Sequence, residues 1–216
     1  MDKINYLMHG FKQFKQIYYS EHKSTFSKDL RHGQNPRFAI IACSDSRVDP
    51  AIVLQTEPGD VFAIRNVAAL VPPCEDIQND KGYHGTSAAL EFAVLGLKVE
   101  HIIIIGHVQC GGVANMVKKH TVKTQEDQFL SKWTDLLEIA CERALKLDPT
   151  LTGDDLLRAS EKQSVKLSLD NLSTFPFITE AVEKGNLQLH GWYLNIFDAT
   201  LEKWDDRTNS FNFLVK

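Results

Sequence analysis

The hydrophobic pattern of the chain alternates between helical spacing and short continuous runs. Apolar residues between positions 4 and 17 recur every three or four residues, which predicts an amphipathic first helix. Residues 37–42, 61–65 and 101–105 instead form continuous runs rich in β-branched side chains, which are typical of buried strands. Helical patterns lie between these runs, so the alternation predicts an α/β fold with a mainly parallel central sheet flanked by helices.

The same patterns, together with capping and turn residues, predict further elements. These are a helix capped by Thr86 or Ser87 that runs through Leu97, helices over 126–147 and 154–172, a fourth strand over 187–190 and 192–197, and a C-terminal edge strand over 211–215. We therefore expect a single domain, with an N-terminal helical arm at residues 1–33 and an α/β core at residues 34–216.

Composition and charge narrow the class of protein. The chain has 216 residues, of which 43% are hydrophobic and 24% charged, and its formal net charge is -4. This balance gives no reason to expect nucleic-acid binding, and no apolar run is long enough to predict a membrane span. No secretory signal pattern is visible at the N-terminus, so we expect a cytoplasmic protein. Four cysteines in a chain of this length favour a metal site over a disulfide framework.

Two of the predicted strands are followed by metal-ligating side chains. Cys43 comes directly after the run at 37–42, and His107 and Cys110 follow the run at 101–105. Parallel strands present the residues at their carboxyl ends to one edge of the sheet, so we expect these three side chains to meet. Two thiolates and an imidazole suit zinc, and three protein ligands leave its fourth position open for water. The sequence therefore predicts a catalytic zinc site.

Residues beside the ligands suggest how this site works. Asp45 and Arg47 lie just past Cys43, where the carboxylate could accept a hydrogen bond from the zinc-bound water or coordinate the metal itself. A bidentate clamp by Arg47 would decide between these two roles, although the pair could also be an ordinary surface ion pair. Gly111 and Gly112 allow a tight turn and a close approach of the backbone, and we place Gly111 among the substrate-binding residues.

Five motifs in a fixed order resemble those of a β-class carbonic anhydrase. They are CSDSRV, PGDVFAIRNVA, GTSAALEFAVL, GHVQCGG and HGW, within a resemblance that runs from about Gln34 to about Phe197. The resemblance implies zinc held by the two cysteines and the histidine, and an Asp–Arg pair beside the zinc-bound water. It also implies the reversible hydration of CO2 to bicarbonate and a proton by attack of zinc-bound hydroxide. Homodimers, or multiples of dimers, are the implied assembly.

Residues 33–36 and 70–73 resemble the plant-type branch of this family. In that branch the glutamine matching Gln34 donates a hydrogen bond to bicarbonate, and the residue matching Phe62 lines the CO2 pocket. Phe92 stands where the plant-type branch carries a pocket tyrosine, and we assign it to the same pocket. Val108 is a departure, because a small polar residue usually follows the zinc histidine.

A second, allosteric branch of the family surrounds an inhibitory bicarbonate with a tryptophan, an arginine and a tyrosine. Only Arg65 matches this set, because Ile40 and Leu194 replace the other two. Aliphatic side chains offer a bicarbonate oxygen no hydrogen-bond donor, and a buried charge without donors is costly. We therefore expect no cooperative inhibition by bicarbonate.

Two alternatives remain open at this point. The first is a hydrolase of CS2 or COS on the same scaffold, which the motifs do not exclude. The second is a non-catalytic zinc protein that acts as a scaffold or sensor, which would need a fourth protein ligand. Cys74 is the spare thiol in a nearby loop, but a closed structural site would need neither Asp45 nor Arg47.

Overall fold

The computed structural model describes residues 2–24, 31, 33–75, 84–121 and 128–216. The chain divides into two compact units, Met1–Asn35 and Pro36–Lys216. The first contains helices α1 (Lys3–Gln16) and α2 (Tyr18–Glu21), and the side chain of Asp2 caps α1. The apolar residues of α1 are exposed within this unit. The description of the chain as a single domain with an arm at 1–33 stays a prediction.

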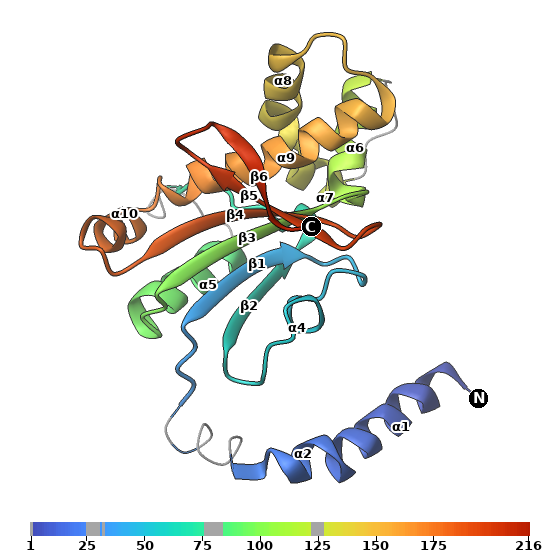
Figure 1. The fold of residues 1–216 in the computed structure, drawn as a ribbon, viewed down its shortest axis with the longest axis vertical. Helices are drawn as coiled ribbons and strands as arrows, with labels where there is room; N and C mark the ends of the chain where they lie inside the picture. The colour runs from blue at the N-terminus through green and yellow to red at the C-terminus, as the bar shows by residue number, and fades with distance from the viewer. Residues whose placement is uncertain (1, 25–30, 32, 76–83, 122–127) are drawn as a thin grey trace. The chain divides into compact units, whose positions relative to one another are not determined.

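The second unit holds a six-stranded sheet and the helices that connect its strands (Figure 1). The strands are β1 (Phe38–Cys43), β2 (Val61–Asn66), β3 (His101–His107), β4 (Gln188–Asn195), β5 (Thr200–Asp205) and β6 (Ser210–Val215). The helices are α4 (Pro50–Val53), α5 (Gly85–Glu91), α6 (Gly111–Thr121), α7 (Gln128–Thr134), α8 (Glu138–Leu147), α9 (Gly153–Leu172) and α10 (Pro176–Glu183), with the short elements η1 (Val67–Ala69), η2 (Phe92–Gly96) and η3 (Asp135–Leu137). None of the helices described is both long and apolar enough to cross a membrane.

The strand order is β2-β1-β3-β4-β5-β6. Neighbours from β2 to β4 are parallel, and β5 and β6 are added as antiparallel strands, with β6 at the edge. The predicted α/β fold with a mainly parallel sheet and a C-terminal edge strand is therefore confirmed. The parallel register places Cys43 opposite Asn66, and Ala42 opposite Ile105, so β1, β2 and β3 end close together.

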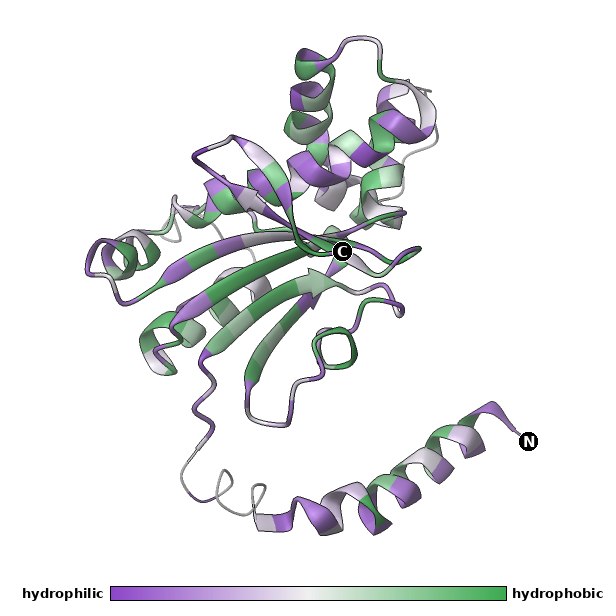
Figure 2. Ribbon diagram, in the orientation of Figure 1, coloured by the Kyte–Doolittle hydropathy of each residue, from purple (hydrophilic) through white to green (hydrophobic). Residues whose placement is uncertain are grey.

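The central strands are apolar on both faces, as expected for parallel strands that helices cover on both sides. Figure 2 shows this as hydrophobic colouring along most of β1 and β3. Alternate residues of these two strands enter two different clusters. Ile40 and Ile103 pack with residues of α6 and α8, and Ile41 and Ile104 pack with residues of α5 and α10. α9 contributes side chains to both clusters, so it joins the two layers of the core.

Helix boundaries in the middle of the chain differ from the predictions. The expected helix over 126–147, of which residues 126 and 127 lie outside the described part of the chain, is divided. α7 ends at Thr134 and α8 begins at Glu138, with the tighter turn η3 between them. The break coincides with two tertiary anchors. The indole of Trp133 donates to the Val67 carbonyl (2.9 Å), and the Thr134 hydroxyl lies 3.0 Å from the side-chain oxygen of Asn115. These contacts override the helical periodicity of the sequence.

Two further elements were misjudged or missed. The helix expected to start with a Thr86 or Ser87 cap begins at Gly85 without a side-chain cap, and its end widens into the π-helical turn η2. β5 was not predicted, because its sequence TLEKWD has neither a continuous apolar run nor strict alternation. Its pairing with β4 and β6 fixes it as a strand.

Candidate metal centre

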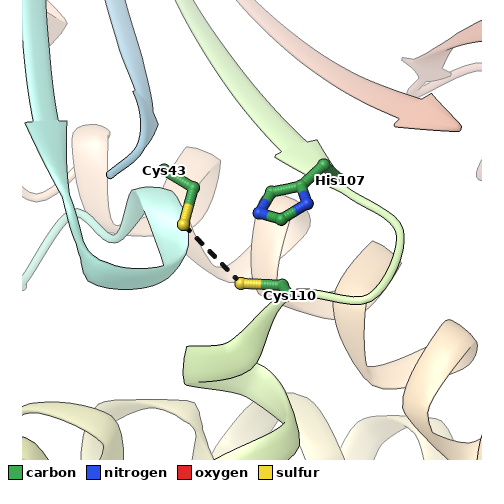
Figure 3. A group of neighbouring side chains, drawn as sticks. All are labelled: Cys43, His107 and Cys110. Carbon is green, nitrogen blue, oxygen red and sulfur yellow. Dashed lines mark hydrogen bonds between the residues drawn. The ribbon is translucent and has the colours of Figure 1, made fainter. Parts of the chain in front are cut away.

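Three side chains from two strand ends face a common space (Figure 3). Cys43 is the last residue of β1, His107 is the last residue of β3, and Cys110 directly precedes α6. Their potential ligand atoms all lie within 4.8 Å of one another, and the two Sγ atoms are 3.9 Å apart. All three residues are buried. The predicted convergence of these residues at the carboxyl edge of the sheet is therefore present.

The orientation of His107 fits a metal ligand. Its Nδ1 lies 2.9 Å from the Val108 carbonyl oxygen, which can only accept, so Nδ1 carries the proton of the neutral ring. Nε2 then presents a lone pair, and it is buried with no hydrogen-bond partner among the described residues. A buried polar atom without a partner is costly, and a metal ion at this point would satisfy it. The orienting group is the Val108 backbone, so this function does not require a polar side chain at position 108.

The two cysteines interact strongly. The hydrogen bond from the Cys110 thiol lowers the pKa of Cys43 to about 4, against the effect of burial, and the backbone of Asp45 and Ala68 contributes further hydrogen bonds. The resulting Cys43 thiolate, together with burial, raises the pKa of Cys110. Zinc takes thiolates, so a bound cation would release the Cys110 proton. The donor set of two sulfurs and one imidazole fits zinc.

A strained turn lies beside Cys43. Ala68 has a φ of 68°, in the left-handed region that is unfavourable for a side chain with a Cβ. The Asn66 side chain holds this turn by accepting from the Leu70 N–H and donating to the Leu70 carbonyl, both at 2.8 Å. The start of α6 approaches so closely that a Cβ on Gly112 would lie 2.9 Å from the Ala68 Cβ. Gly112 is therefore required for this approach.

Asp45 and Arg47 form the predicted clamp. The Arg47 backbone N–H and Nε each donate to Asp45 Oδ1 at 2.9 Å, and Arg47 Nη2 donates to Oδ2 at 2.7 Å. The hydrogen bond from the Arg47 side chain, outweighing desolvation, holds the pKa of the Asp45 carboxyl well below its usual range. Asp45 therefore stays a carboxylate that only accepts hydrogen bonds. Arg47 Nη2 also lies 3.4 Å from the Gln109 carbonyl, which ties the clamp to the second ligand loop.

Arg65 holds the loop that carries Cys43 and Asp45. Its Nε and Nη2 donate to the Cys43 carbonyl at 3.1 and 2.8 Å, and Nη2 also donates to the Asp45 carbonyl at 2.7 Å. Its Nη1 donates to Asp49 Oδ2 at 2.6 Å. Each of the three guanidinium nitrogens is thus engaged within the protein. Ile40 and Leu194, the other two positions of the family's second bicarbonate site, are buried apolar residues.

Phe62 and Phe92, the two predicted pocket aromatics, do not lie beside the metal-ligating group of the same chain. The rings of Phe62 and Phe92 are 5.8 Å apart. Phe62 pairs with Ala39, and Asn66 pairs with Cys43, so Phe62 lies four positions from the level of Cys43. Four positions correspond to about 13 Å along a strand. Phe92 is 51% exposed.

Three other predicted residues have different placements. Gly111 is the first residue of α6, adjacent to Cys110. Apart from its chain neighbours and the backbone of its own helix, nothing described lies within 4 Å of the point where its Cβ would be. Gln34 is exposed within the N-terminal unit. Cys74, the fourth ligand that a closed structural site would need, is exposed, and it is not in the ligand group found among the described residues.

Glu161 of α9 is a site residue that the sequence reasoning missed. It is 1% exposed, its Oε1 accepts from the Cys110 N–H at 2.9 Å, and its Oε2 accepts from the Tyr193 hydroxyl at 2.7 Å. Burial raises the pKa of Glu161, while these hydrogen bonds act in the opposite direction. A signal was present in the sequence, because Glu161 lies four residues from both Leu157 and Val165, in the apolar stripe of the helix.

Comparisons with known proteins agree on one family. A family model described as carbonic anhydrase matches residues 38–201. The mitochondrial β carbonic anhydrase 6 of Arabidopsis thaliana is 39% identical over 211 residues, covering 96% of this chain and 71% of that protein. The structure of the β-carbonic anhydrase CcaA is similar with a TM-score of 0.90 and 31% identity, covering 100% of this chain and 94% of that one.

A tetrameric β-carbonic anhydrase from the ascomycete Sordaria macrospora is also similar. Its TM-score is 0.80 at 28% identity, covering 94% of this chain and 97% of that chain. The residues matched by the family model include Cys43, His107, Cys110 and Glu161.

Proposed function

The chain belongs to the β-class carbonic anhydrases, zinc lyases that hydrate CO2 reversibly to bicarbonate and a proton, and from this premise we propose how its residues carry out the reaction. The matches favour this activity over a CS2 or COS hydrolase and over a non-catalytic zinc protein.

We propose that Cys43, His107 and Cys110 hold one zinc ion. The observation that carries this assignment is the buried His107 Nε2, which has no hydrogen-bond partner among the described residues and shares a space with two sulfurs. Two thiolates balance the charge of Zn²⁺, so the ion can be buried at small electrostatic cost. When bound, zinc supplies a polarised water that serves as the nucleophile toward CO2.

Asp45 and Arg47 act on that water. The Asp45 carboxylate can only accept, so it takes a hydrogen bond from the water and thereby fixes the direction of the attacking lone pair. Arg47 keeps Asp45 from moving to the metal as an additional ligand, which would exclude the water. Its hydrogen bonds of 2.7 and 2.9 Å to both carboxylate oxygens support this role.

The substrate pocket belongs to an assembly, in our proposal a homodimer or a multiple of dimers. Phe62 and Phe92 of one chain line the CO2 pocket beside the ligands of the other, Gly111 leaves room for the substrate, and the Gln34 amide donates a hydrogen bond to bicarbonate. The separation of Phe62 from Cys43 along the sheet supports this arrangement, as does the exposure of Phe92. The exposed apolar residues of α1 also favour self-association.

Metal content and turnover test the zinc site together. We expect about one zinc per chain in the purified protein, and loss of both metal and CO2 hydration in Cys43→Ser and Cys110→Ser. Cys74→Ser makes the same chemical change at an exposed cysteine outside the ligand group, and should keep both. Zinc is measured by atomic absorption, and hydration by stopped-flow with a pH indicator. Full activity in zinc-free Cys110→Ser would overturn the assignment.

Complementation between two defective chains tests the shared pocket. A Cys110→Ser chain keeps Phe62, and a Phe62→Ala chain keeps the ligands, so a mixed dimer contains one complete site. Co-expression of the two differently tagged chains should therefore restore activity that neither homodimer has. No restoration in purified mixed dimers, or a stable active monomer by light scattering, would contradict the proposal. A cytoplasmic location stays a prediction, to be tested by cell fractionation.

A further inference from the structure

We propose that Glu161 is a positioning residue of the zinc site, which fixes the backbone of Cys110 so that its sulfur faces the metal. The inference rests on the proposed function, because it takes Cys110 as a zinc ligand. Glu161 belongs to α9, a helix that supplies none of the three ligands. It acts on the site from outside, through the Cys110 N–H.

Two glycines let α9 come close enough for this contact. A Cβ on Gly106 of β3 would lie 2.4 Å from Val165 Cγ2, and a Cβ on Gly191 of β4 would lie 2.8 Å from Val165 Cγ1. α9 is thus pressed directly against the backbone of both strands at Val165. Glu161 is one helical turn before Val165, and this turn brings its carboxylate to the end of β3, where the ligand loop begins.

The ligand loop needs such an anchor. Between His107 and Cys110 the chain passes through Gln109, whose φ of 57° lies in the unfavourable left-handed region. Strained backbone of this kind persists only where surrounding contacts hold it. The Val108 N–H donates to the Leu194 carbonyl at 3.0 Å, and the Cys110 N–H donates to Glu161 Oε1 at 2.9 Å. Glu161 therefore closes the loop at the residue that carries the ligand.

The groups around Glu161 match the proposed positioning role. Its second oxygen accepts from the hydroxyl of Tyr193 in β4, so one carboxylate joins the ligand loop, α9 and β4. The Nη2 of Arg158 lies 3.0 Å from Oε1, within ion-pair distance although its N–H groups are not directed as hydrogen bonds. A buried carboxylate costs free energy unless it is paired and hydrogen-bonded. Here the groups that pair with the Glu161 carboxylate include the backbone N–H of Cys110, a proposed metal ligand.

The test compares the loss of the acceptor with the loss of the charge. Glu161→Met has a similar size but no acceptor, and we expect its zinc affinity to fall by about 10–100-fold, the usual effect of removing a group that orients a metal ligand. Glu161→Gln can still accept from the Cys110 N–H through its amide oxygen, and should stay within about threefold of wild type, well short of that loss. Glu202→Met is the matched control, because the Glu202 carboxylate also pairs with α9, through Lys162.

Zinc dissociation constants are measured by chelator competition, on proteins whose folding is checked by circular dichroism. Cobalt substitution gives a second measurement, since the sulfur-to-cobalt absorption reports the geometry at Cys110. We expect this absorption to change in Glu161→Met and not in Glu202→Met. Should Glu161→Met not fold, Glu161→Asp replaces it, because its carboxylate is one methylene shorter and cannot reach both donors.

A folded Glu161→Met protein with wild-type zinc affinity and cobalt spectrum would overturn the proposal. A Glu161→Gln protein as weak as Glu161→Met would also overturn it, because charge rather than the hydrogen bond would then be responsible. These outcomes differ from a failure of the proposed function. If wild type holds zinc and Cys110→Ser loses it, the zinc site stands whatever Glu161 does.

Discussion

Gly106→Ala tests whether the close contact between α9 and β3 stabilises the protein and its site. The added Cβ would lie 2.4 Å from Val165 Cγ2, whereas carbon atoms in favourable contact are about 3.5–4.0 Å apart. The two elements must therefore separate by about 1 Å or more. Val165 is 1% exposed, and a valine in a helix strongly prefers one rotamer, so the methyl group cannot turn away.

Overpacking of this kind costs about 1–3 kcal/mol. For a chain of this size, each kcal/mol lowers the melting temperature by about 2–4 °C. The displacement also draws Glu161 away from the Cys110 N–H, so zinc affinity should fall with stability. Urea titration and calorimetry measure the first effect, and chelator competition measures the second.

Gly85→Ala is the matched control for this prediction. Apart from its chain neighbours and the backbone of its own helix, nothing described lies within 4 Å of its added Cβ, and Gly85 opens α5. Alanine is the better helix former, so this variant should be as stable as wild type or slightly more stable. Gly106→Ala with wild-type stability would refute the packing argument, because the short contact with Val165 would then relax without cost.

Three other predictions concern the Asp45–Arg47 clamp, the pH dependence of stability and inhibition by bicarbonate. Arg47→Ala should keep zinc but lower the CO2 hydration rate about tenfold. This is the lower end of the about 10–100-fold effect of groups that orient a metal site, because Arg47 is half exposed. A wild-type rate would exclude the proposed gating of Asp45 by Arg47. Burial and the charge of His101 lower the pKa of His190, so below about pH 6.5 the unfolded chain takes up a proton that the folded chain does not. The free energy of unfolding should therefore decrease as the pH falls from 7.5 to 5.5, and His190→Gln should reduce that slope in urea titrations; an equal slope would contradict this. Because the guanidinium of Arg65 is engaged within the protein, bicarbonate at neutral pH should inhibit without cooperativity, and a sigmoidal loss of initial rate would contradict this.

The proposed ligand group could be predicted from sequence because the positions of its residues depend on simple geometry. Cys43 and His107 end two apolar runs, and parallel strands bring such ends together. The Asp45–Arg47 clamp could also be predicted, because the two residues are close in sequence. Glu161 was not predicted, because its contact with Cys110 spans 51 residues and depends on how deeply α9 seats on the sheet.

The predicted helix boundaries were wrong for a related reason. The apolar periodicity of residues 126–147 is compatible with one continuous helix, but Trp133 and Thr134 contact η1 and α6 and interrupt it. Such contacts are tertiary, and local periodicity carries no information about them. The proposed role of Phe62 could not be judged from the sequence pattern either, because a pocket shared between chains would be a property of the assembly.

The separation of the ligands along the chain has a consequence for the order of events in biosynthesis. His107 and Cys110 lie in one short loop, but Cys43 is on a strand that joins them only when β1 pairs with β3. In a small zinc finger the metal organises an otherwise unfolded chain. Here the complete ligand set exists only after a long-range parallel pairing has formed, and such pairing is slow. We therefore expect zinc to be captured by an already folded chain, so that metal supply limits activation rather than folding.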